Sequence, residues 1–588
     1  MNKVSHIVLP VLTILLLSAC AQRELNTKVS HATGWNYYDK KTTYFEAING
    51  VSYGTPSSMV AIEGGSFTIG EKDEFITAPR DNLSRSVTVS SFYMDKYEIT
   101  NMDWNEYLRW MQIVFGNTNP NLVKKVLPDT TVWREEMAYN EPYLQYYFHH
   151  PAYSFYPVVG VSWTQAMAYC QWRTDRVNEL ALWSCGEIER PPFDELRPLI
   201  YEEDRTPAEQ PATNVAEDEG TEEEEGGEEE DGEYEEEEET PQQEVDNRPA
   251  EVQEWERSHP GFKMISKEFP NPKDSTKVRV EYYPPYEWVR QHFVFNTEKY
   301  LQYDQYQPKF GNRPIIDKYT NLPRKVNSSD GILVIGFRLP TEAEWEFAAY
   351  APIADEGGLS IEKKIYPWSG YHPRDLSKEN IGRLQANFVR GRGDMMGMSG
   401  DLNDNYVITG PVDAFLPNDF GLYNMAGNVN EWVLDVYRET SYQETSEYNS
   451  FRGNIFSQPK RDSLGHLMMD SIGCIVITYN AEDDKRDYKD GDSTAYILTD
   501  YPLSRDTLML AAYARAGIDT TALKTDPSDI LAPRINKNSR VYKGGSWKDR
   551  IYWLNPSTRR YLDQDKSSNT IGFRCAMSIL GEQQVTAQ

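Results

Sequence analysis

A dense run of acidic residues near the middle of the chain limits which segments can share a hydrophobic core. Between Glu217 and Glu239, 17 of 23 residues are acidic and none is basic. Like charges at this density repel, and too few apolar side chains are present to offset the entropy lost on ordering. We therefore expect residues 199–258 to be an acidic disordered insertion, so a folded domain must be assembled from segments on both sides of it.

The same run accounts for more than half of the formal net charge of −31 carried by the 588 residues. A protein that binds nucleic acid needs a basic surface to neutralise phosphates. The charge distribution therefore argues against a nucleic-acid partner.

The first twenty residues have the pattern of a bacterial export signal that ends in a lipid-attachment site. Lys3 is followed by an apolar stretch from Ile7 to Leu17, which is too short for a transmembrane helix of about 20 apolar residues. The stretch ends in Leu17-Ser18-Ala19-Cys20, which matches the bacterial lipobox. The alternative is an ordinary signal peptide followed by a chance cysteine. We expect residues 1–19 to be a lipoprotein signal peptide and Cys20 to be lipidated.

The residues after Cys20 bear on where the anchor lies. Ala21 follows in place of an aspartate, and no strongly acidic stretch of the kind that directs some lipoproteins to the cell surface comes next. This pattern favours the outer membrane with the protein facing the periplasm. Residues 20–57 are polar and turn-rich, and we expect them to be a lipidated N-terminus and tether that can extend ~3.3 Å per residue.

From residue 58 the chain consists of short patterned segments separated by glycine turns. Met59–Gly70 predicts a β-hairpin, two strands joined by a Gly-Gly turn. Met102–Phe115 has apolar side chains at helical spacing after Asn101, a helix cap. Glycines admit positive φ angles in a loop-rich core. Charged residues inside these segments would need partners if buried, and we expect them to be structural rather than catalytic. They include Glu342, Glu346, Arg338, Glu431 and Arg574.

Seven motifs follow one another in a fixed order between residues 59 and 576. They are Met59–Gly70 with Phe92–Asn101, Pro157–Trp163, Phe337–Glu346, Tyr366–Trp368, Asn418–Trp432, Lys543–Trp547 and Ile571–Cys575. This series resembles the formylglycine-generating-enzyme (FGE), or sulfatase-modifying-factor, family. The resemblance implies an α+β fold of the FGE-sulfatase, C-type-lectin-like kind, with little regular secondary structure and enlarged here by insertions.

The motifs and the composition together predict the organisation of the chain. We expect an FGE-like domain in three parts, with an aromatic insertion and a second insertion between them and a short tail after them. The three parts are residues 58–198, 331–437 and 539–580; the insertions after the acidic one are residues 259–330 and 438–538; the tail is residues 581–588.

A further set of segments is not typical of the FGE family at large. It comprises Thr33–Tyr37, Leu127–Thr130, Trp133-Arg134, Ala138–Tyr143, Phe148–Tyr153 and Trp172–Glu179. Together with the lipobox, these segments resemble the GldJ/GldK family of gliding-motility and type IX secretion lipoproteins of the Bacteroidetes. The resemblance implies a non-catalytic scaffold on the periplasmic side of the outer membrane, with GldK- and GldN-type proteins among its partners.

Catalysis in the FGE family requires residues that this chain lacks. The family holds copper between two cysteines shortly after the Gly-Gly-Ser motif, and the matching positions here are Asp549 and Leu554. Without thiolates there is no soft copper site. The sulfoxide-synthase branch uses iron bound by a histidine cluster, but none of the eight histidines lies at helical i, i+4 spacing to another. The sequence predicts no catalytic and no cofactor-binding residue, and an oxidase-type enzyme is the less favoured alternative.

A lectin-like module that binds glycans or calcium is the other alternative. Asp394, Asp401, Asn403 and Asn405 supply the hard oxygen ligands that Ca²⁺ prefers, although aspartate and asparagine also favour turns. The resemblance implies that structural Ca²⁺ is common in the family. These four residues are therefore candidates for a calcium site, without an assignment.

Four cysteines follow Cys20, namely Cys170, Cys185, Cys474 and Cys575. They allow three disulfide pairings, and their spacing matches no zinc site. Cys170 and Cys575 lie in apolar stretches and are expected to be small core residues.

If the chain is a scaffold, its specific contacts should come from the segments added to the FGE fold, which are residues 127–153, 282–306 and 438–538. Aromatic side chains there could anchor an interface or could complete an enlarged core. The candidates are Tyr139, Tyr143, Tyr146, Tyr147, Phe148 and Trp288.

Overall fold

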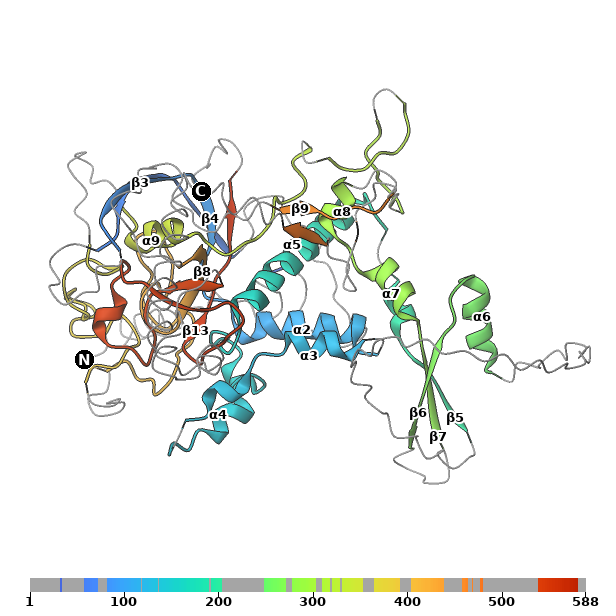
Figure 1. The fold of residues 1–588 in the computed structure, drawn as a ribbon, viewed down its shortest axis with the longest axis horizontal. Coiled ribbons are helices and arrows are strands. Elements are labelled where there is room, and N and C mark those ends of the chain that lie inside the picture. Colours follow the sequence, from blue (N-terminus) through green and yellow to red (C-terminus); the bar gives the residue numbers. More distant parts are fainter. Residues whose placement is uncertain are drawn as a thin grey trace, which may run out of the picture. The chain divides into compact units, whose positions relative to one another are not determined.

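The computed structural model describes most of the chain outside the acidic run, and the bounded helices and strands are drawn in Figure 1. The described residues are 32–33, 58–71, 82–117, 119–135, 137–189, 192–203, 248–270, 278–302, 309–317, 320–327, 330–352, 364–391, 403–437, 457–463, 468, 476–479 and 538–579. The chain forms two compact units. Unit 1 comprises Met1–Gln112, Asn121–Arg190 and Val294–Gln588, and unit 2 comprises Ile113–Pro120 and Pro191–Phe293.

The sheets of unit 1 join strands from opposite ends of the chain. One sheet has the order β1–β4–β14, and a second has the order β12–β11–β8–β13, in which only β13 runs parallel to its neighbour. Strands β2 and β3 form a separate antiparallel pair. The hairpin predicted over Met59–Gly70 is wrong, because β1 pairs with β4 and β2 pairs with β3. The bounds are β1 Met59–Ile62, β2 Gly65–Ile69, β3 Arg85–Val89, β4 Phe92–Asp95, β8 Asn430–Val436, β11 Ser539–Lys543, β12 Arg560–Asp563, β13 Ile571–Gly572 and β14 Ala576–Ser578.

Helices complete unit 1, and two of them, α5 and α9, begin with capping boxes. Ser162 and Gln165 cap one another's backbone at the start of α5, and Thr341 and Glu344 do the same for α9. Such caps satisfy the amide groups that a helix start leaves unpaired. The helices are α2 Asn101–Phe115, α3 Pro120–Val126, α4 Glu141–Tyr146, α5 Trp163–Cys185, α8 Thr297–Gln302 and α9 Glu342–Tyr350, with 3₁₀ turns η1 Thr130–Trp133, η2 Pro151–Tyr153 and η8 Ile551–Leu554. The end of α2 from Ile113 and the first residue of α3 are counted with unit 2.

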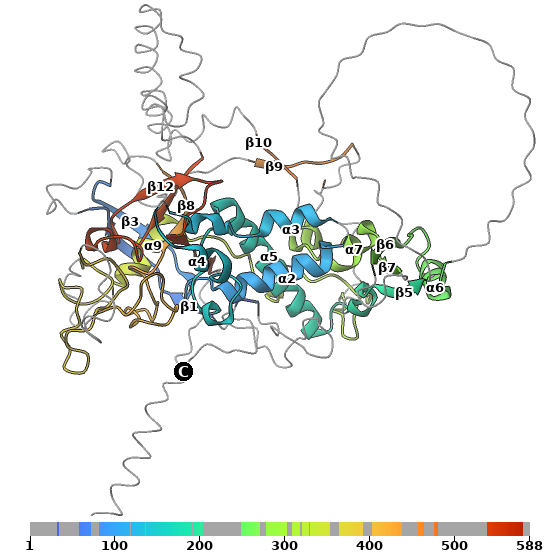
Figure 2. The same cartoon turned by 90° about the horizontal axis from the view of Figure 1, so that it is seen from below.

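Helix α9 is the centre of the main hydrophobic core. All nine of its residues are buried, and it packs against β2, β3 and β8 (Figure 2). Trp345 lies in the core with Val433 of β8 and Val541 of β11, while its indole Nε1 donates to Glu431 Oε2 at 2.7 Å. The core therefore places buried carboxylates next to aromatic side chains.

Two residues of the expected tether are part of this unit. Ala32 and Thr33 are each only 4% exposed. Arg173 Nε donates to the Ala32 carbonyl at 2.7 Å, and the Thr33 hydroxyl donates to Glu106 Oε1. Within the expected tether, residues 20–57, these two positions are thus held against the domain, because a buried guanidinium and a carboxylate bind them.

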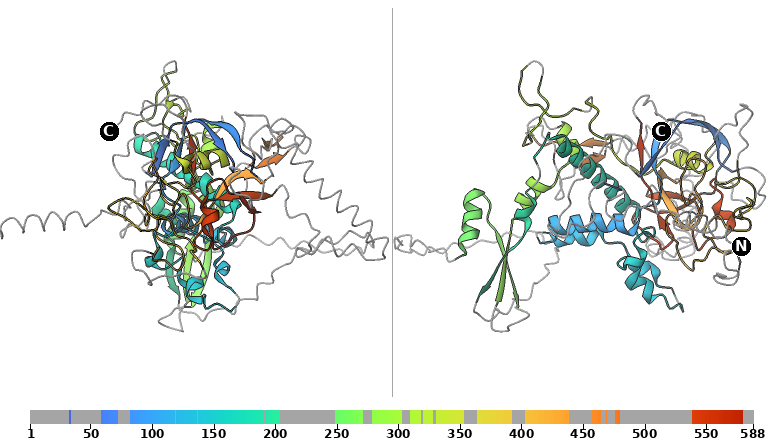
Figure 3. Two further views of the ribbon diagram at one scale, coloured as in Figure 1. Left: turned by 90° about the vertical axis from the view of Figure 1, so that its left-hand side faces the viewer. Right: turned by 180° about the vertical axis from the view of Figure 1, so that it is seen from behind.

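Unit 2 is a small antiparallel sheet with helices. Its strand order is β5–β7–β6, from Leu199–Glu203, Val278–Tyr283 and Ile265–Pro270. Val252 and Trp255 of α6, Ala250–Ser258, pack in one hydrophobic cluster with Val280 and Tyr282 of β7, and Figure 3 shows the green helix next to the strands. The unit also contains η3, Phe193–Leu196, and α7, Tyr286–Phe293.

Unit 2 corrects the expected limits of the acidic insertion. Strand β5 and helix α6 lie within residues 199–258, where disorder is predicted. They are ordered because β7, farther along the chain, supplies the pairing partner and the apolar surface they need. The acidic run itself lies outside the described residues, and residues 294–330 of the expected aromatic insertion belong to unit 1.

Part of the second expected insertion is ordered as well. Strands β9, Ser457–Pro459, and β10, Ile477–Tyr479, form an antiparallel ribbon. Most of residues 438–538, and Cys474 among them, lie outside the described residues.

Candidate functional site

We refer to residues 546–560, which begin with the serine of the Gly-Gly-Ser motif, as the closed corner, because the side chains at its two key positions are paired or buried. Asp549 accepts two hydrogen bonds from the Arg560 guanidinium, both at 2.7 Å, and one from the Ser546 hydroxyl at 2.6 Å. Burial raises the pKa of Asp549, but the hydrogen bonds and charge of Arg560 outweigh it, so the pKa lies below its usual range. The carboxylate is therefore committed to structural bonds.

The second position that the resemblance assigns to a copper-binding cysteine is also closed. Leu554 is fully buried and packs in a cluster with Leu384, Phe388 and Ala426. The chain at Gly545 passes close to the residue before Leu554. Gly545 has a φ of 73°, and a Cβ at that position would lie 2.8 Å from the Trp553 carbonyl oxygen. The aliphatic side chain of Leu554, in this hydrophobic cluster, can neither bind a metal nor carry a redox step.

The charged residues of the family motifs are buried and paired with one another. Glu342 accepts from Lys543 and Arg559, Glu346 accepts from Lys543 at 2.7 Å, and Arg338 binds Glu344. Glu431 forms a two-pronged pair with Arg574, and both side chains are fully buried. These pairs satisfy the charges that burial would otherwise penalise, and the structural role expected from the sequence fits them.

Glu98 adds a second carboxylate to the Glu431–Arg574 pair. It accepts hydrogen bonds from Asn424 Nδ2 at 2.9 Å and from Asn428 Nδ2 at 3.0 Å. Burial, followed by the charge of Glu431, raises its pKa to about 8, and Arg574 opposes that rise. Both asparagines have positive φ angles, which asparagine tolerates better than most residues, so the loop is shaped to present its amides to Glu98.

The sulfur atoms of Cys170 and Cys575 lie 3.5 Å apart, and both residues are buried. Cys170 is on α5 and Cys575 precedes β14, so the contact joins segments 405 positions apart. Both are free thiols in this structure and are core residues, as the sequence predicts.

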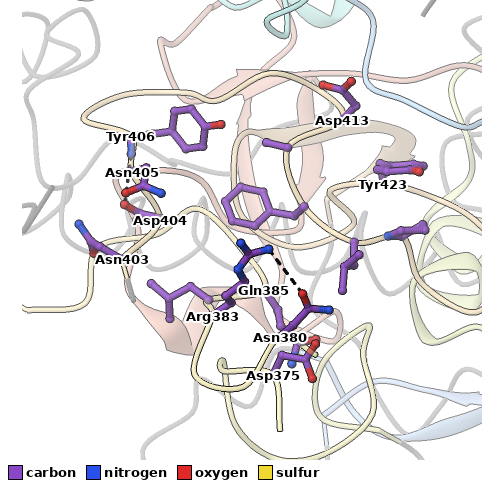
Figure 4. Close-up of a pocket in the computed structure, with 15 residues that line it drawn as sticks. Asp375, Asn380, Arg383, Gln385, Asn403, Asp404, Asn405, Tyr406, Asp413 and Tyr423 are labelled. Carbon is purple, nitrogen blue, oxygen red and sulfur yellow. Dashed lines mark hydrogen bonds between the residues drawn. The ribbon is translucent and has the colours of Figure 1, made fainter. Parts of the chain in front are cut away.

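An open cavity of about 380 Å³ lies elsewhere in unit 1 (Figure 4). Three segments line it, near residues 375–385, 403–406 and 413–423. Its polar side chains include Asp375, Arg383, Asn403, Asp404 and Asp413. Sequence reasoning missed Asp375, Arg383 and Asp413, since nothing in the pattern of these turn-rich segments indicates that they meet.

The structure places two of the four calcium candidates at this cavity. Asn403 and Asn405 line it, whereas Asp394 and Asp401 lie outside the described residues. In the part of the chain that the structure describes, no group of three or more His, Cys, Asp or Glu side chains is placed to hold a metal ion. A calcium site therefore stays a prediction.

The lipidation candidate Cys20 also lies outside the described residues. Among the helices that are described, none is both long enough and apolar enough to cross a membrane.

Comparison with known proteins places the chain in a family. A model of the sulfatase-modifying factor enzyme 1-like domain, FGE-sulfatase, matches residues 45–471. The chain therefore belongs to the FGE-sulfatase family, and its fold is the mixed α+β fold of that family with sparse regular secondary structure.

Curated relatives include both active and inactive members. The chain is 45% identical over 102 residues to the formylglycine-generating enzyme of Thermomonospora curvata, which covers 17% of this chain and 27% of that protein. It is 39% identical over 105 residues to the inactive Cα-formylglycine-generating enzyme 2 of Bos taurus, which covers 18% of this chain and 28% of that protein. The chain thus spans little more than a quarter of the length of these relatives. A solved structure, PvdO from Pseudomonas aeruginosa, is 15% identical with a TM-score of 0.35 and covers 89% of this chain and 94% of that one.

Proposed function

We propose that this protein is a non-catalytic lipoprotein, anchored to the outer membrane through Cys20 and facing the periplasm. In this proposal it acts as a scaffold of the type IX secretion and gliding-motility machinery and is of the GldJ type. The outer membrane and GldK- and GldN-type proteins are its partners, and the FGE-like domain serves as a rigid body rather than as an enzyme.

The observation that carries the non-catalytic part of the proposal is the closed corner. Asp549 is bound by Arg560, and Leu554 is buried in a hydrophobic cluster, at the two positions where the family's copper-binding thiolates are expected. A carboxylate held in an ion pair and an aliphatic side chain offer neither a soft ligand nor an oxidisable group. An inactive relative in the same family is consistent with such a loss.

The motility and secretion part of the proposal is supported by the GldJ-type segments. Two of the residues in these segments, Thr33 and Trp133, are buried in unit 1, where Thr33 binds Glu106 and Trp133 packs with Tyr147. The segments therefore belong to the folded domain, and the resemblance extends to its core as well as to its surface.

The structure narrows the set of expected interface anchors. Tyr147 and Phe148 are buried in unit 1, and Trp288 is buried in unit 2, so of the two alternatives given above these three fit the enlarged core. Tyr139 and Tyr146 are 84% and 52% exposed, and Met137 beside them is fully exposed. We propose Met137, Tyr139 and Tyr146 as anchors for a partner protein, because exposed aromatic and methionine side chains are enriched at interfaces.

Metabolic labelling with a clickable fatty acid tests the anchor. The unaltered protein should take up label and fractionate with the outer membrane, and Cys20→Ala should do neither. Label that persists in Cys20→Ala would refute lipidation at this residue.

Two measurements on the purified protein test the non-catalytic assignment. We expect no stoichiometric copper by elemental analysis and no conversion of a Cys-x-Pro-x-Arg peptide to formylglycine. Conversion would overturn the argument from Asp549 and Leu554.

Co-purification from detergent-solubilised outer membrane tests the scaffold. The double variant Tyr139→Ala/Tyr146→Ala should fold normally and lose envelope partners. Tyr371→Ala, at a tyrosine that is 68% exposed elsewhere on unit 1, is the matched control and should retain them. Equal recovery of partners with both variants would remove these tyrosines from the interface.

A further inference from the structure

Two buried cysteines meet where the first and the last part of the FGE-like domain join. Cys170 lies on α5, Cys575 directly precedes β14, and their sulfur atoms are 3.5 Å apart. Each of the two residues is at most 1% exposed. A disulfide bond has a sulfur–sulfur distance of about 2.05 Å, so the two atoms would need to approach by about 1.5 Å. Bond formation therefore needs a movement smaller than the length of one cysteine side chain.

Hydrogen bonds hold the backbone around both cysteines, independently of the sulfur atoms. Asp95 of β4 accepts from the Cys575 backbone amide at 3.0 Å and from Arg173 Nη1, on α5, at 2.6 Å. The Thr174 hydroxyl donates to the Cys170 carbonyl oxygen at 2.9 Å. One carboxylate thus binds both the helix that carries Cys170 and the segment that carries Cys575, which keeps the two thiols together.

The position of Cys185 decides between the pairings that the sequence leaves open. Cys185 is the last residue of α5 and follows Cys170 on the same helix. At a rise of 1.5 Å per residue, a helix separates these two positions by about 22 Å, whereas the Cα atoms of a disulfide lie within about 7 Å. Because Cys575 lies against Cys170, it is equally far from the end of the helix. The remaining pairing joins Cys170 to Cys575.

Burial decides when such a bond can form. It raises the pKa of the Cys575 thiol well above its usual range, and the hydrogen bond with Cys170 adds to this rise. Only a thiolate attacks a disulfide, so a thiol that stays protonated in a closed core does not react. Oxidation therefore belongs to the folding of the chain, before α5 and β14 enclose the sulfur atoms.

We propose that Cys170 and Cys575 are joined by a disulfide bond as the exported chain folds, with a thiol–disulfide oxidase of the cell envelope as the oxidant. The thiolate of one cysteine attacks a sulfur of the oxidant's disulfide and forms a mixed disulfide, and the other cysteine then displaces the oxidant as a dithiol. The protein's two thiols give up two protons and two electrons, which the oxidant takes up as its two thiol groups. This inference rests on the export part of the proposed function and is separate from the scaffold role.

Mass spectrometry of the protein purified from the envelope fraction without reductant tests the bond. The protein is denatured, its free thiols are alkylated, and it is digested. We expect the peptides that contain Cys170 and Cys575 to be linked, to be two hydrogen atoms lighter than their sum, and to separate when a reductant is added. Alkylated Cys170 and Cys575 in protein from the envelope fraction would overturn the proposal, whereas protein recovered only from the cytoplasm would refute export itself.

Two single variants test the pairing. Cys170→Ala should leave Cys575 fully open to alkylation without reductant, and the matched control Cys185→Ala should leave the linked peptides unchanged. Loss of the link in both variants, or a link from Cys575 to another cysteine, would contradict the pairing.

Refolding tests the same bond without any substitution. Reduced, unfolded protein should form the linked peptides when it is refolded with oxidised glutathione, and its thermal midpoint should exceed that of protein refolded with a reductant, because the bond restricts the unfolded chain. Dithiothreitol should break the link in urea but leave it intact in the folded protein, since the sulfur atoms are buried. Natively refolded protein whose Cys170 and Cys575 stay free in oxidised glutathione would overturn the proposal.

Discussion

The closed corner and the cavity are both built from loops of unit 1, but they differ in what satisfies their side chains. In the closed corner Asp549 is bound by Arg560, and Leu554 is fully buried. In the cavity the Asn403 Nδ2 atom has no hydrogen-bond acceptor among the described residues, and Leu416 is 60% exposed. Side chains that satisfy one another stabilise a fold, whereas side chains kept unsatisfied cost stability and are retained where something outside the chain uses them. The difference separates loops whose side chains satisfy one another from a cavity whose lining is partly unsatisfied and exposed.

The sharpest test of this contrast compares two leucines. Leu554→Ala should lower the free energy of unfolding by about 2–5 kcal/mol, because it empties a filled hydrophobic cluster. Leu416→Ala should change it by less than about 0.5 kcal/mol, because that side chain is mostly exposed. Urea denaturation monitored by tryptophan fluorescence measures both. Similar losses at the two positions would erase the distinction between the regions.

A comparison of two aspartates is expected to give the next largest effect. Asp549→Ala leaves Arg560 without its carboxylate partner and Ser546 without its acceptor. The two charged side chains are 15% and 21% exposed, so we expect a loss of about 2–3 kcal/mol, below the roughly 3–5 kcal/mol of a fully buried pair. The matched change Asp413→Ala in the cavity should be close to neutral in the same denaturation experiment. A neutral Asp549→Ala would show that the corner is not held by this pair.

Glu98, which accepts hydrogen bonds from Asn424 and Asn428, should make the free energy of unfolding depend on pH. The pKa of Glu98 is raised to about 8 in the folded protein, against an ordinary value of 4.5. The folded state therefore holds this proton where the unfolded state releases it. The stabilisation is complete below about pH 4.5 and is lost as the pH rises through about 8.

Glu98→Gln should remove this part of the pH dependence and leave a flatter curve of unfolding free energy between about pH 5 and pH 8, because each unit of pKa difference between the folded and unfolded states is worth about 1.4 kcal/mol. Asp175, whose pKa burial raises to about 6, acts in the same direction at lower pH and is present in both proteins. The difference between the two curves thus isolates Glu98. Parallel curves would mean that Glu98 is ionised in the folded protein.

The sequence predicts the closed corner and the paired charges better than it predicts the cavity. Glu431 and Arg574 are charged residues in motifs expected to be buried, so each needs an oppositely charged partner. That Asp549 and Leu554 replace cysteines can be read directly from the sequence. The cavity depends on where three turn-rich segments meet, and turn residues carry no periodicity that fixes their spatial neighbours. The docking of Ala32 is equally hidden, since it depends on Arg173, far along the chain.

The smallest expected effect on the free energy of unfolding is that of Asp413→Asn, and its sign distinguishes the cavity from the closed corner. Asp413→Asn removes one carboxylate from a cavity that holds two others, Asp375 and Asp404, so mutual repulsion should fall and the free energy of unfolding should stay unchanged or rise by a few tenths of a kcal/mol. The same change at a structural carboxylate, Asp549→Asn, should lower the free energy of unfolding. Differential scanning calorimetry, with Asp565→Asn as an exposed reference, can compare the thermal midpoints. A clear loss of stability in Asp413→Asn would mean that the fold itself uses this carboxylate, and the cavity would then resemble the closed corner more than a binding site.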